Sequence, residues 1–235
     1  MVAVVFGSSG GIGRALAEDV VASGRYKTVF AISRSGVAVN GAINLTAEFT
    51  DASELAVVAD EIRKAGPVTL CLVASGFLSG ADLQPEKTYR AMTLEAFQRV
   101  FAANTFGPAL IAAQMLPLMP KAERSVFAAL SARVGSISDN RLGGWHAYRA
   151  SKAALNMLIR NFALEQARRA PGNICVGLHP GTVDTGLSRT FQGGVADGKL
   201  FMPAQAAGYL LDVVDRLTPE DSGKCFDWTG KEVPA

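Results

Sequence analysis

Short, almost continuously apolar runs alternate along this chain with longer segments in which apolar residues recur every three or four positions. The runs predict buried strands at residues 2–6, 28–32, 42–45 (or slightly later), 68–74, 125–130, 174–178 and 224–227. The longer segments predict helices at residues 12–22, 51–64, from 93 onward, 104–119, 146–169 and 203–217. Asp51, with Glu54 three residues later, and Thr93 are residue types that begin helices.

Strands that are apolar on both faces and alternate with helices are typical of a parallel sheet covered by helices on each side. Right-handed crossovers then give a doubly wound α/β fold with about seven strands. No repeat, linker or low-complexity block divides the sequence, so we expect a single domain over residues 1–235. Ligands of such folds bind beyond the carboxyl ends of the strands. We therefore expect one site, formed by the loops after Phe6, Ile32, Ala74, Leu130 and Leu178.

The composition of the chain restricts the classes of partner that we expect. Of the 235 residues, 49% are hydrophobic and 19% are charged, which excludes a disordered chain. The net charge of +2 gives no reason to expect nucleic acid or a membrane surface as a partner. Cys71, Cys175 and Cys225 form no C-x-x-C pair, so we expect reduced thiols and no metal site. The uncharged stretch at 100–120 contains polar residues and reads as a buried helix. The first residues read as a strand and not as a signal peptide, so we expect a cytoplasmic protein.

The first predicted strand is followed by the loop Gly7-Ser8-Ser9-Gly10-Gly11-Ile12-Gly13 and then by a helix. Its glycines fit G-x-x-x-G-x-G and G-x-x-G-x-x-G, not the commoner G-x-G-x-x-G spacing. Such a loop can turn sharply, approach a pyrophosphate closely and present a helix N-terminus to it. Because the loop directly follows an N-terminal strand, we expect a nucleotide site rather than an ordinary glycine-rich turn.

The second predicted strand ends at Ser33 and Arg34, where an NAD site would have an acid that binds the ribose hydroxyls. A carboxylate would repel a 2′-phosphate, whereas a guanidinium can hold one with two hydrogen bonds. The sequence therefore predicts NADP(H) in preference to NAD(H). The alternative is that Arg34 is a solvated surface side chain.

Tyr148 and Lys152 are four residues apart, so on a helix their side chains share one face. A free tyrosine titrates near ~10 and is a poor base at neutral pH. A neighbouring ammonium would favour the phenolate and lower the tyrosine pKa. Such a tyrosine could give a proton to a carbonyl oxygen, or take one from an alcohol. The spacing alone also occurs by chance, and it gains weight only beside the glycine loop.

With these motifs in place, the chain resembles the classical short-chain dehydrogenase/reductase (SDR) family over nearly all of its length. The resemblance is carried by Gly7-x-x-x-Gly11-Ile12-Gly13, Asn104, Tyr148-x-x-x-Lys152 and His179-Pro180-Gly181. Segments within residues 134–156 and 223–228 are similar to the C-factor-like branch of that family. The resemblance implies a Rossmann fold and an oxidoreductase that transfers a hydride between NADP(H) and a carbonyl or alcohol substrate.

The resemblance also implies residue roles. Tyr148 would be the acid/base, and Lys152 would lower its pKa and hold the nicotinamide ribose. Asn104 would anchor a water that extends the proton relay, and a serine after the strand at 125–130 would bind the substrate oxygen. The residues expected to contact the cofactor are Gly7, Ser9, Gly11, Ile12, Gly13, Ser33, Arg34, Glu48, Phe49, Ala74, Ser75, Gly76, Tyr148, Lys152, Pro180, Gly181, Thr182, Val183 and Thr185.

The chain departs from the family pattern at the serine. The family usually has Ser-Ser and uses the second, whereas this chain has Ser131-Ala132. Ser131 is the first candidate for the role, although neighbouring strand residues point to opposite faces. Ser136 is the second candidate and Ser138 a weaker one. Further departures are Ala74-Ser75-Gly76, where the family has Asn-Ala-Gly, and Glu48-Phe49, where it often has Asp-Val.

Several expectations concern the surroundings of the site. We expect a substrate lid at residues 183–202, and structural roles for His146 and His179. We also expect a homodimer or homotetramer that pairs through the helices at 104–119 and 146–169. The first alternative function is a non-catalytic NADP-binding regulatory or signalling protein on the same fold. The second is an epimerase or dehydratase, which would need a larger substrate domain than the residues after Gly181 provide.

Overall fold

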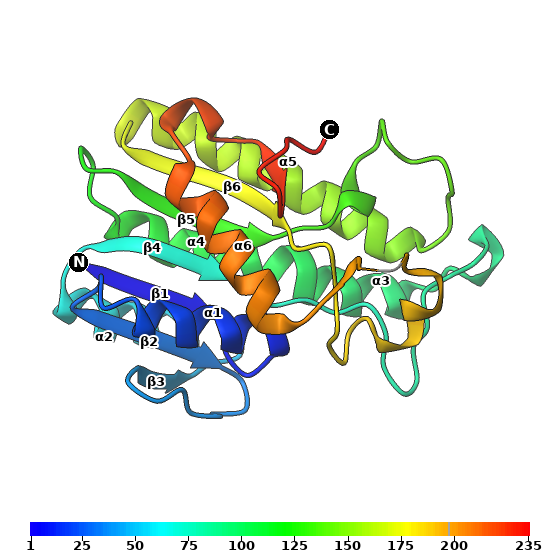
Figure 1. Ribbon diagram of the computed structural model, residues 1–235, viewed down its shortest axis with the longest axis horizontal. Coiled ribbons are helices and arrows are strands. Elements are labelled where there is room, and N and C mark those ends of the chain that lie inside the picture. Colours follow the sequence, from blue (N-terminus) through cyan, green and yellow to red (C-terminus); the bar gives the residue numbers. More distant parts are fainter. Residues whose placement is uncertain (197) are drawn as a thin grey trace.

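The computed structural model describes residues 1–196 and 198–235, and its centre is a parallel sheet with helices on both faces (Figure 1). The seven strands lie in the order β3-β2-β1-β4-β5-β6-β9. Their bounds are β1 (Val2–Phe6), β2 (Thr28–Ser33), β3 (Ile43–Thr46), β4 (Val68–Val73), β5 (Ser125–Leu130), β6 (Asn173–His179) and β9 (Cys225–Asp227). Each neighbouring pair is parallel. The doubly wound α/β fold predicted from the sequence is confirmed.

The helices form a layer on each side of the sheet. Their bounds are α1 (Gly11–Ala22), α2 (Ala52–Ala65), α3 (Leu94–Phe101), α4 (Gly107–Met115), α5 (His146–Arg169) and α6 (Pro203–Arg216). In Figure 1, α1 and α6 cross in front of the sheet while α4 and α5 lie behind it. One apolar cluster joins the sheet to α1 and α6, and a second joins it to α2, α4 and α5.

Strand β1 shows why the apolar runs are continuous. Ala3 and Val5 belong to the cluster under α1 and α6, whereas Val2, Val4 and Phe6 belong to the opposite cluster. All five side chains are at most 1% exposed. Successive strand residues point to opposite faces, so a strand covered on both faces must be apolar at every position.

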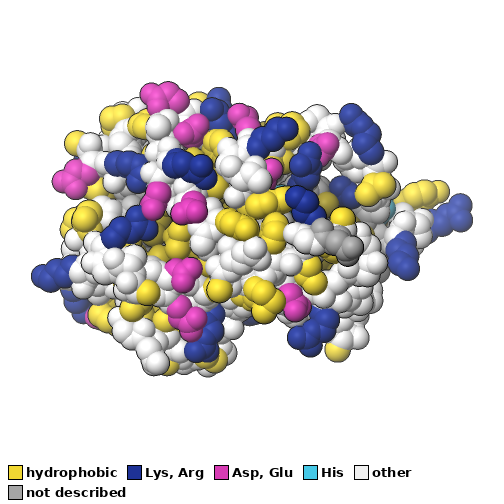
Figure 2. Space-filling model, in the orientation of Figure 1, with side chains coloured by type: hydrophobic (Ala, Val, Ile, Leu, Met, Phe, Trp, Pro, Cys, Tyr) yellow, Lys and Arg dark blue, Asp and Glu magenta, His cyan; other side chains and the backbone are white. Residues whose placement is uncertain are grey.

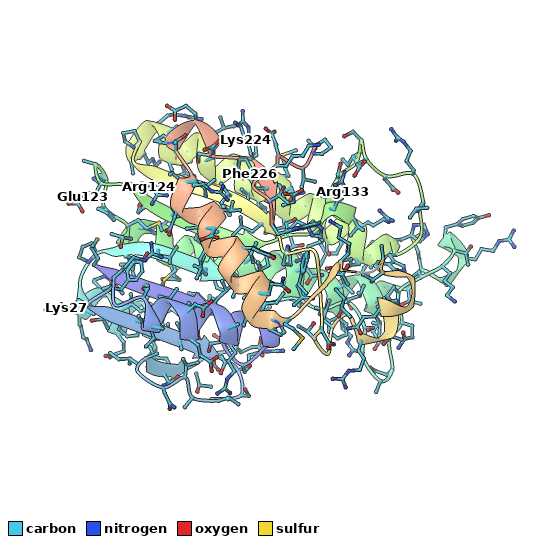
Figure 3. All side chains as sticks on the ribbon, viewed as in Figure 1. Lys27, Glu123, Arg124, Arg133, Lys224 and Phe226 are labelled. Atoms are coloured by element: carbon cyan, nitrogen blue, oxygen red, sulfur yellow. The ribbon has the colours of Figure 1, made fainter. Side chains whose placement is uncertain are left out.

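The order of the strands places a crevice at the carboxyl end of β1. The chain leaves β1 for β2 on one side, and β4 pairs with β1 on the other side. Loops from adjacent strands therefore diverge at this edge, where open α/β sheets bind their ligands. Figure 3 shows Arg133 beyond the carboxyl ends of the strands, with Lys27, Glu123 and Arg124 near their amino ends.

The structure corrects the helix predicted at 104–119. Helix α3 continues through a π-helical segment (Ala102–Phe106) into α4, and a 3₁₀ turn (Leu116–Leu118) follows. Pro117 ends the α-helical hydrogen bonding because it has no backbone N–H to donate. The sequence also missed two short strands outside the main sheet, β7 (Thr182–Val183) and β8 (Leu200–Phe201).

Three further observations concern the surface charge, the helices and clusters of metal-binding side chains. Lys and Arg side chains are interspersed with Asp and Glu on the face in Figure 2, with no large patch of one sign. No helix in the described part of the chain has both the length and the apolar character needed to cross a membrane. Within residues 1–196 and 198–235, no group of three or more His, Cys, Asp or Glu side chains is arranged to hold a metal ion.

Candidate active site

Two cavities lie against the glycine loop. The first, of about 430 Å³, is lined by Gly7, Ser9, Gly10, Arg34, Glu48, Phe49, Thr50, Ala74, Ser75, Gly76, Phe77, Arg99, Ala102 and Ala103. The second, of about 330 Å³, is lined by Ile12, Leu78, Ser131, Ala132, Arg133, Val134, Trp145, Tyr148, His179, Pro180, Gly181, Thr182, Val183, Thr185, Leu187, Ser188 and Phe191. The glycine loop contributes to both, so one long ligand could extend from one cavity to the other.

Most of the residues that the sequence predicts for the site line one of these cavities. Five of the predicted residues line neither: Gly11, Gly13, Ser33, Asn104 and Lys152. Four of them, Gly11, Gly13, Asn104 and Lys152, instead lie against a residue that does line a cavity, as described below. The loops after β1, β2, β4, β5 and β6 thus meet in one region, as the strand order requires.

The glycine loop has positions that no other residue could occupy without movement. Gly7 has a φ of +84°, a left-handed conformation that side chains disfavour. A Cβ at Gly13 would lie 2.2 Å from the carbonyl oxygen of Gly7, which is far inside contact distance. A Cβ at Gly11 would lie 2.7 Å from Cγ2 of Thr185. The loop therefore lies flat on the start of α1, with its backbone open to a ligand.

The polar groups around this loop fit a dinucleotide. Helix α1 begins at Gly11 with no side-chain cap, so its first N–H groups are free to bind a phosphate. The hydroxyls of Ser8 and Ser75 are buried and have no hydrogen-bond partner within the described structure. Ser75 lines the first cavity. Buried polar groups normally have partners, so the Ser75 hydroxyl fits a site completed by a polar ligand.

The residues after β2 and β3 form the outer wall of the first cavity. The Arg34 side chain is 69% exposed, and its Nη1 lies 4.0 Å from Oε2 of Glu48. Ser33 is buried and its Oγ accepts a hydrogen bond from the Gly36 N–H at 3.1 Å. Phe49 points into the core, where its ring meets Phe6 edge-on, so its contribution to the cavity does not include a free ring face.

Tyr148 and Lys152 lie in consecutive turns of α5, and both are buried. The Lys152 Nζ donates a hydrogen bond to the Leu130 carbonyl at 2.7 Å and lies 5.9 Å from the centre of the Tyr148 ring. Burial raises the pKa of Tyr148 to about 12, and burial lowers the pKa of Lys152 to about 8. Loss of water is the cause of the raised tyrosine pKa, and the Lys152 ammonium is directed at the Leu130 carbonyl. The lowering of the tyrosine pKa expected from Lys152 stays a prediction.

Asn104 lies in the π-helical segment and is fully buried. Its Oδ1 accepts a hydrogen bond from the Phe77 N–H at 2.8 Å, and its Nδ2 donates to the Phe77 carbonyl at 2.9 Å and to the Ser151 hydroxyl at 3.1 Å. The side chain thus ties the loop after β4 to the middle of the Tyr148–Lys152 turn. Its predicted role of anchoring a water stays a prediction.

The serine candidates lie in different places. The Ser131 hydroxyl donates to Oδ1 of Asn156 at 2.6 Å, although Ser131 is also among the residues that line the second cavity. Ala132 packs in the apolar cluster that contains Tyr148. The Ser136 hydroxyl accepts from the Asp139 N–H at 3.1 Å, and both Ser136 and Ser138 donate to the Ala235 carbonyl. Neither Ser136 nor Ser138 lines the second cavity.

The wall of the second cavity is mostly apolar and aromatic. The Trp145 ring meets Phe191 with centres 4.9 Å apart and Tyr148 with centres 6.2 Å apart. His179 also lines the cavity, and burial lowers its pKa to about 4, so its ring is neutral at pH 7. Five residues of the predicted lid at 183–202 line the cavity, namely Val183, Thr185, Leu187, Ser188 and Phe191, while residue 197 lies outside the described residues.

Arg99 and Trp145 are among the cavity side chains that the sequence did not indicate. Arg99 lines the first cavity and pairs with Asp82 at 2.7 Å. Trp145 lines the second cavity three residues before Tyr148. Arg99 belongs to no motif, so no signal could have found it. Trp145 could have been found, since a large aromatic residue just before the Tyr-x-x-x-Lys pattern has to lie near the tyrosine.

Comparisons with known proteins agree with this geometry. Among curated proteins, the chain is 40% identical over 136 residues to C-signal of Myxococcus xanthus, which covers 58% of this chain and 76% of that protein. It is 36% identical over 134 residues to the 1-hydroxy-2-glutathionyl-2-methyl-3-butene dehydrogenase of Rhodococcus sp. (strain AD45), covering 57% of this chain and 56% of that protein.

A solved structure covers the whole chain. The NADPH-bound carbonyl reductase from chicken fatty liver aligns with a TM-score of 0.84 and 26% identity, covering 100% of this chain and 94% of that one. A family model described as short chain dehydrogenase matches residues 1–194. Since this match spans most of the sequence and includes the glycine loop and the Tyr148–Lys152 pair, the chain belongs to the short chain dehydrogenase family of oxidoreductases.

Proposed function

We propose that the protein is an NADP(H)-dependent carbonyl reductase or alcohol dehydrogenase with Tyr148 as its acid/base. The observation that carries the proposal is the position of Tyr148, which faces an apolar cavity that shares the glycine loop with the first cavity. The structural relative from chicken fatty liver is a carbonyl reductase with NADPH bound, which supports the same cofactor and substrate class here.

The two cavities suggest how a dinucleotide would be held. The adenosine half would occupy the first cavity, with Arg34 at the 2′-phosphate and the glycine loop at the pyrophosphate. The nicotinamide half would lie in the second cavity against Pro180, Gly181 and Thr182. When bound there, the cofactor supplies or accepts the hydride.

The buried tyrosine suits proton donation. With a pKa of about 12, Tyr148 is a neutral phenol at pH 7 and can give its proton to a carbonyl oxygen as the oxygen becomes an alkoxide. Lys152 one turn away would stabilise the phenolate that remains, because its ammonium lies 5.9 Å from the ring centre. Leu78, Trp145 and Phe191 would exclude water from the reacting carbonyl.

The test is NADPH oxidation with a panel of carbonyl compounds: 4-nitrobenzaldehyde, benzil and menadione. We expect turnover with at least one of them, and a fall of about 10²–10⁴-fold in kcat for Tyr148→Phe, because the proton donor is lost. Binding of NADPH, followed by its fluorescence, should change less than threefold in Tyr148→Phe. Full activity in that variant would contradict the role of Tyr148.

A second candidate function is a non-catalytic NADP(H)-binding regulatory protein. The observation that favours it is Ala132, a methyl group packed beside Tyr148 at the position where the family has its working serine. Tight NADPH binding without turnover of any compound in the panel would favour this candidate over the first.

A further inference from the structure

Helix α5 begins without a cap from its own sequence. The residue before it, Trp145, has a φ of +50° and makes no side-chain hydrogen bond to the first turn, and that turn contains no acidic residue. Trp145 is the one residue other than glycine with positive φ in the described structure, and it follows two further left-handed residues, Gly143 and Gly144. A buried helix end with free N–H groups needs a partner from elsewhere.

The partner is Glu86, from the loop between β4 and α3. Its carbonyl oxygen accepts the Trp145 N–H at 2.5 Å, and its carboxylate Oε2 accepts the Ala147 N–H at 3.3 Å. Glu86 is 5% exposed, and its second oxygen, Oε1, has no hydrogen-bond partner among the described residues. A carboxylate at the positive end of a 24-residue helix is favoured by the helix dipole.

These two bonds fix the residues on each side of Ala147. Trp145, on one side, forms the aromatic wall of the second cavity against Phe191. Tyr148, on the other side, is the proposed acid/base. A left-handed tryptophan costs free energy and persists only where the surroundings enforce it. The backbone carbonyl of Glu86 contributes to that enforcement at Trp145, and its side chain binds Ala147 from 61 residues away in the sequence.

We propose that Glu86 is a positioning residue, which holds the first turn of α5 so that Tyr148 and Trp145 keep their places in the second cavity. The expected effect on catalysis rests on the proposed function, whereas the hydrogen bond from Ala147 to Glu86 does not depend on it. What matters is a hydrogen-bond acceptor at the Ala147 N–H, so glutamine should replace glutamate while alanine should not.

The experiment compares the full-length wild type with Glu86→Ala and Glu86→Gln. The matched control is Glu165→Gln, an exposed acid near the other end of the same helix that pairs with Arg169. Three quantities are measured for each: amide hydrogen exchange at Ala147 and Tyr148, the dissociation constant for NADPH, and kcat and KM with the most active carbonyl compound of the panel above.

We expect Glu86→Ala to speed exchange at the two amides at least tenfold and to lower kcat at least tenfold, with the NADPH dissociation constant changed less than threefold. Glu86→Gln and Glu165→Gln should stay within threefold of the wild type in all three quantities. The comparison of kcat with the NADPH dissociation constant matters, because a variant that is only less stable would also lose cofactor binding.

The proposal is overturned if exchange in Glu86→Ala equals that of the wild type, or if Glu86→Gln loses as much kcat as Glu86→Ala. If Glu86→Ala does not fold, Glu86→Gln is compared with the wild type alone, and a tenfold loss of kcat in Glu86→Gln overturns the proposal. If the wild type reduces no carbonyl compound, the proposed function fails, while the exchange rates still decide whether Glu86 holds the helix.

Discussion

The Ser131 hydroxyl donates a 2.6 Å hydrogen bond to Oδ1 of Asn156, and the next side chain along the chain, Ala132, packs with Tyr148. The two residues therefore point in different directions, as alternation after a strand requires. The Ala132 methyl group therefore lies beside the proposed acid/base, while the neighbouring Ser131 hydroxyl is bonded to Asn156.

Ala132→Ser should add the missing donor to the substrate oxygen. One such donor contributes about 10²–10³ in kcat where it is well placed, so a rise of about tenfold in kcat/KM with a carbonyl substrate is expected. The matched variant Ser131→Ala should keep its activity within about threefold but lose about 1 kcal/mol of stability, because a buried hydrogen bond is removed. Loss of activity in Ser131→Ala, with no gain in Ala132→Ser, would assign the substrate oxygen to Ser131.

Arg34→Ala should change cofactor preference. A charge-assisted contact to the 2′-phosphate is worth about 1.5–3 kcal/mol, so the dissociation constant for NADPH should rise about 10–100-fold. The constant for NADH, which has no such phosphate, should change less than threefold. Calorimetric titration of both dinucleotides measures the difference, and Arg63→Ala on α2 is the exposed control. Equal losses for the two dinucleotides would show that Arg34 does not read the phosphate.

The rate of carbonyl reduction should fall above pH 8. Burial lowers the pKa of Lys152 to about 8, so the side chain is an ammonium below that pH and neutral above it. The ammonium is the form that stabilises the Tyr148 phenolate left after proton transfer. A pH profile of kcat should therefore be flat below pH 8 and decline above it. Because arginine stays protonated, Lys152→Arg should remove this decline at a lower overall rate, and an unchanged decline in that variant would assign it to another group.

The protein should be a homodimer or homotetramer. The helices expected to pair carry exposed apolar side chains, with Phe106 at 52%, Met157 at 62% and Leu164 at 45% exposure. Light scattering after size exclusion should give a mass of two or four chains. Met157→Asp should shift the mass toward one chain, whereas Val57→Asp on α2, which is 65% exposed, should not. A single-chain mass for the wild type at all concentrations contradicts the prediction.

Sequence pattern predicted most of the framework, for a physical reason. Strands buried on both faces are apolar at every position, and helix α5 was predicted at its observed bounds, His146–Arg169. The sequence does not indicate the π-helical segment at Ala102–Phe106, because π-helical and α-helical hydrogen bonding differ by a single residue and no motif marks the change. The glycine loop and the Tyr148–Lys152 pair are local in sequence, so their spacing already indicates how they lie.

Features that depend on distant parts of the chain could not be predicted. The contact between Glu86 and the start of α5 joins residues 61 positions apart, and neither belongs to a pattern. The spacing of Tyr148 and Lys152 does not show that burial raises the tyrosine pKa, or that the Lys152 ammonium points to the Leu130 carbonyl. Both properties depend on how the whole chain packs.

Thr185 restricts position 11 of the glycine loop to glycine. A Cβ at Gly11 would lie 2.7 Å from the Thr185 methyl group, which is too close for a side chain. Thr185 belongs to the wall of the second cavity, while the loop that contains Gly11 borders the first. This contact therefore lies between the two halves of the proposed dinucleotide site, and a larger residue at position 11 would displace the wall of the second cavity.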